Sequence, residues 1–150
     1  MRKLLVIVFA MMVMVTGCSI NNLYNNTKAL QKDSNTYNLD EESQRVESQM
    51  YEGSITFEGV STIWRYEVEE TTEIDFNINM ESNSGRAKII LLKPDGEIEV
   101  LIEHDADSMT SNEVFSLNLE PGLNRIRVVA ADKAEIKLVT TCEYGEFNII

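Results

Sequence analysis

The feature that most constrains the fold of this chain is an alternation of apolar and polar residues with a period of two. It is clearest over residues 74–80, where the apolar residues are Ile74, Phe76, Ile78 and Met80 and the residues between them are Asp75, Asn77 and Asn79. Successive side chains of a β-strand point to opposite faces, so this pattern predicts a strand with one buried face and one face in water.

Further apolar and alternating runs are separated by short turn sequences. They predict strands at residues 54–57, 63–69, 87–93, 97–103, 114–119, 123–131 and 134–142. Turns are expected at Pro94-Asp95-Gly96, at Glu120-Pro121-Gly122 and at Asp132-Lys133, with proline presetting φ and glycine accepting a positive φ. No convincing amphipathic helix lies between these strands. The prediction is an all-β fold, an antiparallel β-sandwich of about eight strands and of jelly-roll kind.

Residues 1–17 have the form of an export signal. Arg2 and Lys3 are followed by Leu4 to Val15, a run without a single polar side chain. A spanning helix needs about twenty apolar residues, and this shorter run is typical of the apolar region of a signal peptide.

The residues that close this run are Val15, Thr16, Gly17 and Cys18. They resemble the lipobox of bacterial lipoproteins, in which an aliphatic residue and two small or tolerated ones precede an obligatory cysteine. The resemblance implies cleavage before Cys18 and a diacylglyceryl group joined to its sulfur. Two acyl chains anchor a protein stably, because each buried methylene contributes about 0.8 kcal/mol. We therefore expect a lipid anchor on the extracytoplasmic face of the cell membrane, with an uncleaved signal anchor as the alternative.

The segment from residue 18 to residue 50 is dominated by Asn, Ser, Gln, Asp, Glu and Lys, with apolar residues at no clear period. Such a composition predicts a lipidated N-terminus followed by a disordered tether, whose root-mean-square span would be about 30 Å. A short helix over residues 40–50 is the alternative, because Asp40, Glu41 and Glu42 suit a helix start. Residues 51–150 would then form the sandwich domain.

Two turn-containing segments carry a second resemblance. They are Leu91-Leu92-Lys93-Pro94-Asp95-Gly96 and the run from Pro121 to Val128. In the order of its elements, the region from Tyr51 to Cys142 is similar to small β-sandwich lipoproteins of Gram-positive bacteria and, more loosely, to carbohydrate-binding modules.

The charge of the chain excludes one class of partner. Asp and Glu number 25 against 13 Lys and Arg, a formal net charge of −12. Such a surface repels phosphate backbones and anionic headgroups, so we expect no nucleic-acid partner and attachment to the membrane through the lipid at Cys18.

The ionisable residues do not form a catalytic pattern. His104 is the single histidine, and no Gly-x-Ser-x-Gly motif or glycine-rich phosphate loop is present, so we expect neither an enzyme nor a metal or cofactor site. His104 is expected at the edge of a loop. Next to it, Glu103, Asp105, Asp107 and Ser108 bring together oxygens that a calcium ion could use, although a solvated loop is the favoured interpretation.

Cys142 is expected to have no disulfide partner and to be a buried apolar residue of the last strand.

Sugar-binding sandwiches stack rings on exposed aromatic side chains, and the candidates here are Trp64, Tyr66, Tyr144 and Tyr51. Trp64 and Tyr66 share the side of Val68, opposite the charged residues of their strand, which favours packing in the core. Tyr144 and Phe147 follow the last strand, where they either cover one end of the sandwich or hang free. The acidic series Glu67, Glu69, Glu70, Glu73 and Asp75 is interpreted as a solvated face rather than a cation-binding strip.

These features together predict a membrane-anchored cell-surface lipoprotein that acts as a binding or structural module in the envelope. The alternative is a carbohydrate-binding module that recognises cell-wall or exogenous glycans. An exposed aromatic pair flanked by Asn or Asp would favour a sugar, and a broad exposed apolar patch would favour a protein partner.

Overall fold

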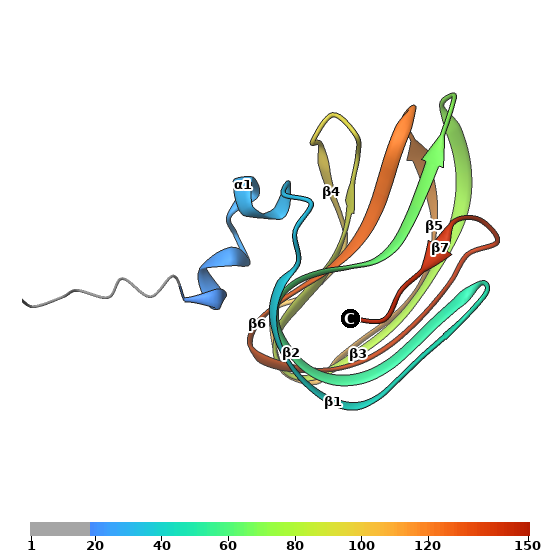
Figure 1. Cartoon of the computed structure of the whole chain (residues 1–150). Coiled ribbons are helices and arrows are strands. Elements are labelled where there is room, and N and C mark those ends of the chain that lie inside the picture. The colour runs from blue at the N-terminus through green and yellow to red at the C-terminus, as the bar shows by residue number, and fades with distance from the viewer. Residues whose placement is uncertain (1–18) are drawn as a thin grey trace, which may run out of the picture.

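The computed structural model describes residues 19–150, apart from the side chains of Glu41 and Glu42. The predicted signal peptide and lipobox lie outside these residues. Figure 1 shows a β structure in which the described N-terminal part forms a small helical unit at one side. The elements are η1 (Ile20–Leu23), α1 (Thr27–Leu30), β1 (Thr36–Glu47), β2 (Met50–Val68), β3 (Thr72–Leu92), β4 (Ile98–His104), β5 (Met109–Leu119), β6 (Gly122–Thr141) and β7 (Glu146–Phe147).

Three strands are much longer than the sequence predicts. β2, β3 and β6 have 19, 21 and 20 residues, and each joins two of the predicted strands into one. They bend side by side at Gly59 (φ 118°), Gly85 (φ 73°), and Asp132 and Lys133 (φ 60° and 49°), where the pairing of the strands also shifts. Positive φ breaks the regular twist of a strand, so these four residues form a bend line at which the sheet folds over on itself.

The bend line divides one antiparallel sheet into two layers. The first layer has the order β1, first half of β2, second half of β6, first half of β3, β5. The second has β7, second half of β2, first half of β6, second half of β3, β4. This is the arrangement of a jelly roll, in which strands far apart in the chain, such as β2 and β6, lie side by side in each layer. The predicted all-β antiparallel sandwich is confirmed.

The main core lies between the two layers. Phe57, Trp64, Phe76, Ile78 and Met80 are all fully buried there, while Asp75, Asn77 and Asn79 are exposed. The alternation over residues 74–80 therefore corresponds to one face of β3 in the core and one in water.

The predicted disordered tether is wrong for the described residues. β1 pairs with β2 from Thr36 opposite Val60 to Glu47 opposite Met50, so the sheet begins well before residue 51. The alternative helix over residues 40–50 is also wrong, because most of these residues belong to β1. Main-chain pairing needs few apolar side chains, and charged residues are common on an edge strand, which explains why β1 lacks a clear pattern.

Residues 19–35 are named the strap, because they cross the outer face of the second layer. Tyr24 and Leu30 are buried there in a second apolar cluster with Val60, Ile90 and Val129. The Tyr24 hydroxyl donates a hydrogen bond to Glu103 over 2.9 Å, and burial together with this carboxylate raises the pKa of Tyr24. The strap is thus part of the folded domain.

Candidate functional site

The end of the sandwich opposite the bend line is named the open end. Here the chain passes between the two layers through turns between strands and through residues 142–147, which follow β6 and include β7. Trp64, Tyr66 and Tyr144, the three candidate ligand-binding residues, all lie at this end. The structure brings them together in one aromatic row, with ring centroids 6.0 Å apart for Trp64 and Tyr66 and 5.9 Å apart for Tyr66 and Tyr144.

Trp64 holds the row in place from within the core. Its side chain is fully buried and meets the Phe76 ring edge to face at 5.3 Å. Its Nε1 donates a 2.8 Å hydrogen bond to the backbone oxygen of Tyr144. The prediction that Trp64 packs in the core is confirmed, and its ring is not a binding platform. Its role at this end is to fix the turn that carries Tyr144.

The turn over residues 142–145 is tied down at several points. The Cys142 amide donates to the Gln49 backbone oxygen over 3.1 Å, and the Tyr144 amide donates to the Cys142 sulfur over 3.5 Å. Gly145 has φ 78° and lies so close to Trp64 that an added Cβ would be 2.6 Å from the indole ring. Only glycine fits this position without strain, so backbone and indole together aim Tyr144 outward.

Tyr144 is the exposed member of the row. Its residue is 49% exposed, and its ring stacks on the half-buried Tyr66 with an interplanar angle of 22°. Tyr144 and Phe147 are expected from the sequence either to cover one end of the sandwich or to hang free. Phe147 covers the end and pairs with Trp64 through the backbone, while Tyr144 presents its ring to water. Tyr51 is not available as a platform, because it is fully buried and its hydroxyl donates to Gln44.

Two hollows flank the tyrosine pair. The larger has a volume of about 580 Å³ and is lined by Tyr144 together with polar side chains, among them Gln49, Glu73, Asp75, Asn77 and Glu143. The smaller, about 420 Å³, lies on the Tyr66 side and is lined by Arg65, Tyr66, Glu67, Leu123, Gly145 and Glu146. We call the larger hollow the Tyr144 groove. Its carboxylates and amides offer acceptors to hydroxyl and amine donors and repel anions.

The acidic series of β2, β3 and the turn between them is exposed along its whole length, as the solvated-face interpretation expects. Two of its members, Glu73 and Asp75, also line the Tyr144 groove. Cys142 is buried, as predicted, although it lies just after β6 and not within a strand. Burial raises the pKa of its thiol, which favours the protonated form.

The environment of His104 differs from the prediction. It is the last residue of β4 and fully buried, not at the edge of a loop. Its Nδ1 lies 2.6 Å from the Ser82 hydroxyl and its Nε2 lies 2.8 Å from the Ser111 hydroxyl. Burial lowers the pKa of His104. An imidazole enclosed by two hydroxyls without a carboxylate joins β3, β4 and β5 as a neutral polar bridge.

Within residues 19–150, no three His, Cys, Asp or Glu side chains gather as a metal site would require, the acids that follow His104 included. Nor does any helix of this region have the length and apolar character needed to cross a membrane.

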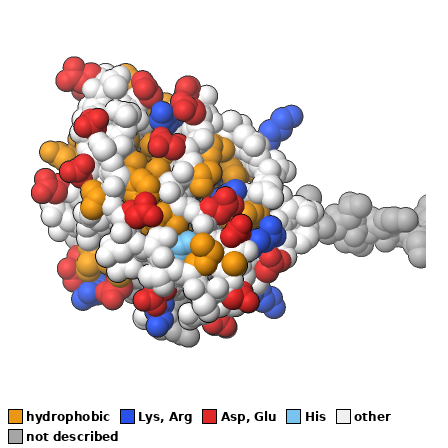
Figure 2. Space-filling model, turned by 180° about the vertical axis from the view of Figure 1, so that it is seen from behind, with side chains coloured by type: hydrophobic (Ala, Val, Ile, Leu, Met, Phe, Trp, Pro, Cys, Tyr) orange, Lys and Arg blue, Asp and Glu red, His pale blue; other side chains and the backbone are white. Residues whose placement is uncertain are grey.

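Two exposed apolar residues lie on the edge strands β4 and β5, one in each layer. Val100 and Val114 are 48% and 64% exposed on these strands. Figure 2 shows hydrophobic side chains grouped among scattered acidic ones on the face that it presents.

The alternation over residues 97–103 predicts that Ile98, Val100 and Ile102 face the core, so the exposure of Val100 contradicts that prediction. The pairing of β3 with β4 shifts between Ile89, opposite Ile102, and Ile90, opposite Val100, so these two residues of β4 do not share a face. Val114 was not singled out, although it precedes the inward-facing residues of its strand.

Comparison with known proteins gives a limited result. No protein-family model and no curated protein matches the chain. Among solved structures, a mutant of CBM29-2, a family 29 carbohydrate-binding module complexed with mannohexaose, is similar with a TM-score of 0.41 and 10% identity over 73% of this chain and 92% of that one. Murine APRIL is similar with a TM-score of 0.36 and 9% identity over 73% of this chain and all of its own. At these scores the similarity bears on neither ligand nor partner.

Proposed function

We propose that this chain is a lipid-anchored protein of the bacterial cell envelope whose β-sandwich binds carbohydrate in the Tyr144 groove, without catalysing a reaction. The anchor rests on the lipobox resemblance of Val15, Thr16, Gly17 and Cys18 and on the apolar run before it. The carbohydrate ligand is inferred from the side chains at the open end of the sandwich.

The observation that carries the ligand class is the exposed ring of Tyr144 next to a groove of carboxylates and amides. An aromatic face packs against the apolar C–H face of a sugar ring. Carboxylate and amide oxygens such as those of Asp75, Asn77 and Gln49 accept hydrogen bonds from its hydroxyls. Three carboxylates line the same groove, so neutral or amine-bearing sugars fit it and phosphorylated or sulfated sugars do not.

The test of the ligand is a glycan array of neutral, amino and acidic oligosaccharides, followed by calorimetry on the best binder. Tyr144→Ala should weaken binding about fivefold, because an aromatic stacking contact contributes about 1 kcal/mol. The matched control is Tyr37→Ala, which removes a 38% exposed tyrosine of β1 far from the open end. Equal affinities of wild type and Tyr144→Ala would contradict the site.

The test of the anchor is Cys18→Ser in the native host. The variant should accumulate as unprocessed precursor without lipid, because only a thiol forms the thioether. Entry of labelled fatty acid into the Cys18→Ser protein would contradict this assignment.

A second candidate function, an interaction module for another envelope protein, is favoured by the exposed valines of β4 and β5. A contiguous group of apolar side chains is typical of a protein-binding surface, and Figure 2 shows hydrophobic side chains grouped on one face. If one of these edge strands contacts the partner, Val100→Glu or Val114→Glu, made separately, should abolish a cross-link to the partner in intact cells, whereas Tyr144→Ala should leave the cross-link unchanged.

A further inference from the structure

The strap begins at the bend line and is fixed there by reciprocal hydrogen bonds. The Asn21 amide nitrogen donates to the Asp132 carboxylate over 3.2 Å, and the Asp132 backbone amide donates to the Asn21 side-chain oxygen over 3.0 Å. Three residues further on, the Tyr24 ring lies under two cations, 4.8 Å from Arg86 Cζ and 4.3 Å from Lys88 Nζ. The first described residues are therefore held against the sandwich.

Arg127 locks the other end of the strap. This side chain is fully buried on the outer face of β6, and its guanidinium donates to three backbone oxygens of the strap, those of Leu30, Lys32 and Ser34, over 2.6–2.9 Å. The Gln31 side chain adds a 2.8 Å bond to the Gly96 oxygen at the turn after β3. These hydrogen bonds fix the strap in one position on the sandwich. The strap therefore cannot serve as a flexible spacer while the bonds are formed.

The consequence concerns the proposed lipid, on which this inference rests. Ser19 follows Cys18 directly, and consecutive Cα atoms are about 3.8 Å apart, so lipid on Cys18 would leave no free chain between the membrane and the docked strap. We infer that the bend-line end of the sandwich lies against the membrane surface and that the open end, with the Tyr144 groove, points away from it.

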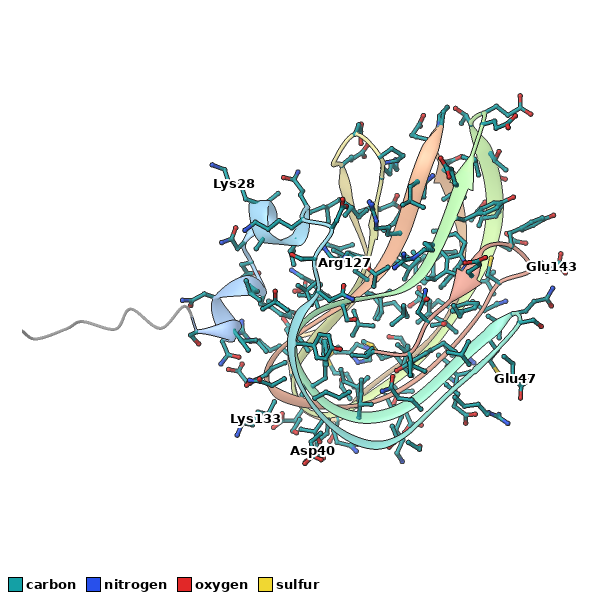
Figure 3. All side chains as sticks on the ribbon, viewed as in Figure 1. Lys28, Asp40, Glu47, Arg127, Lys133 and Glu143 are labelled. Atoms are coloured by element: carbon teal, nitrogen blue, oxygen red, sulfur yellow. The ribbon has the colours of Figure 1, made fainter. Side chains whose placement is uncertain are left out.

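The distribution of side chains agrees with this orientation. In Figure 3, Lys28 and Lys133 lie on the side of the strap and the bend line, with Asp40 near Lys133, and Glu47 and Glu143 lie on the opposite side. Both lysines are exposed. Cations near anionic headgroups offset the repulsion that this acidic domain otherwise meets there. Thr141 lies nine residues beyond Asp132 on the same strand, which places the groove about 30 Å beyond the bend line.

The experiment measures the height of two sites above the bilayer. Full-length lipidated protein, in a Cys142→Ala background, carries one dye at Asp40→Cys, an exposed position of β1 near the bend line, or at Glu47→Cys. It is reconstituted into vesicles of phosphatidylcholine and phosphatidylglycerol with an acceptor on the headgroups. The dye at position 40 should transfer energy strongly to the acceptor, and the dye at position 47 should transfer weakly.

Two variants separate the strap from the rest of the fold. Arg127→Ala should release the strap and reduce the difference between the two dyes, whereas Arg125→Ala, which removes only the ion pair with the exposed Asp33, should retain it. A flexible Gly-Ser linker of about ten residues inserted between Cys18 and Ser19 leaves the folded domain intact and should also remove the difference.

Mass spectrometry of the same samples distinguishes the possible failures. Lipid on Cys18 with equal transfer from both dyes would overturn the orientation and leave the anchor standing. Protein without lipid on Cys18 would overturn the anchor and, with it, the orientation.

Discussion

The two ends of the sandwich are built in different ways. At the bend line, β2, β3 and β6 pass from one layer to the other without interruption, and their conformation depends on Gly59, Gly85, Asp132 and Lys133. At the open end, the layers are joined by turns and by side chains such as Trp64. The difference shows that backbone conformation determines one end and side-chain contacts determine the other, so substitutions should affect the two ends differently.

The largest effect is expected at the bend line. Gly59→Ala should lower the free energy of unfolding by about 3 kcal/mol or more, because φ at Gly59 is 118° and an added Cβ would meet the backbone of Thr36 and Tyr37. Urea denaturation measures this loss. Gly96→Ala is the control: its φ is also positive, at 91°, but its nearest neighbour is the flexible Gln31 side chain at 3.3 Å, so a smaller loss of about 1 kcal/mol is expected. Equal losses would contradict the importance of the bend line.

The second-largest loss of stability is expected from substitutions that release the strap. Arg127→Met should cost about 3 kcal/mol, because it leaves buried backbone oxygens of the strap without their donors. Limited proteolysis should then cut within residues 19–35 while the sheet stays resistant. Arg125→Met removes an ion pair with the 82% exposed Asp33 carboxylate and should cost less than about 1 kcal/mol. A strap that stays protected in Arg127→Met would contradict the locking role of this arginine.

At the open end, Trp64→Phe should cost about 1–2 kcal/mol, because the shortened ring loses the hydrogen bond to the Tyr144 oxygen. Glycan affinity should fall with stability, since the turn that aims Tyr144 is loosened. Phe76→Leu, a substitution deeper in the same core, serves as the control and should lower stability without a comparable loss of affinity. If both variants bind equally, Trp64 does not position the site.

The smallest effect concerns pH. Burial lowers the pKa of His104 in the folded protein, so below about pH 6.5 the unfolded chain takes up a proton that the folded chain does not. The free energy of unfolding should therefore fall as the pH drops below 6.5, down to the lower pKa of the folded state. Urea titrations of wild type and His104→Gln across this range isolate the contribution of the imidazole, and parallel pH profiles of the two proteins would refute it.

The sequence predicted the sandwich well because side-chain alternation reports directly on burial. It predicted Trp64 and Cys142 as core residues for the same reason. It divided β2, β3 and β6 into separate strands, because a glycine or a short polar turn sequence looks the same at a bend within a strand as at a turn between two strands.

Other features were missed because their signals are not local. β1 is joined to the sheet by backbone hydrogen bonds, which leave little trace in side-chain polarity. Trp64 and Tyr144 are 80 positions apart, so no local pattern could show that they touch. Arg127 did leave a signal, as one charged residue within the apolar run from Ile126 to Val129. A buried cation needs acceptors, and these turned out to be the carbonyl groups of the strap.

The length of β6 has a mechanical consequence. This strand runs from the docking site of the strap to the Tyr144 turn and is hydrogen-bonded to β2 on one edge and to β3 on the other. Tension between a membrane anchor and a bound glycan would act along the strand axis, perpendicular to those hydrogen bonds, and load them in shear. Many bonds would have to break at once before the strand could slide, so a protein of this design should resist pulling forces at its two ends.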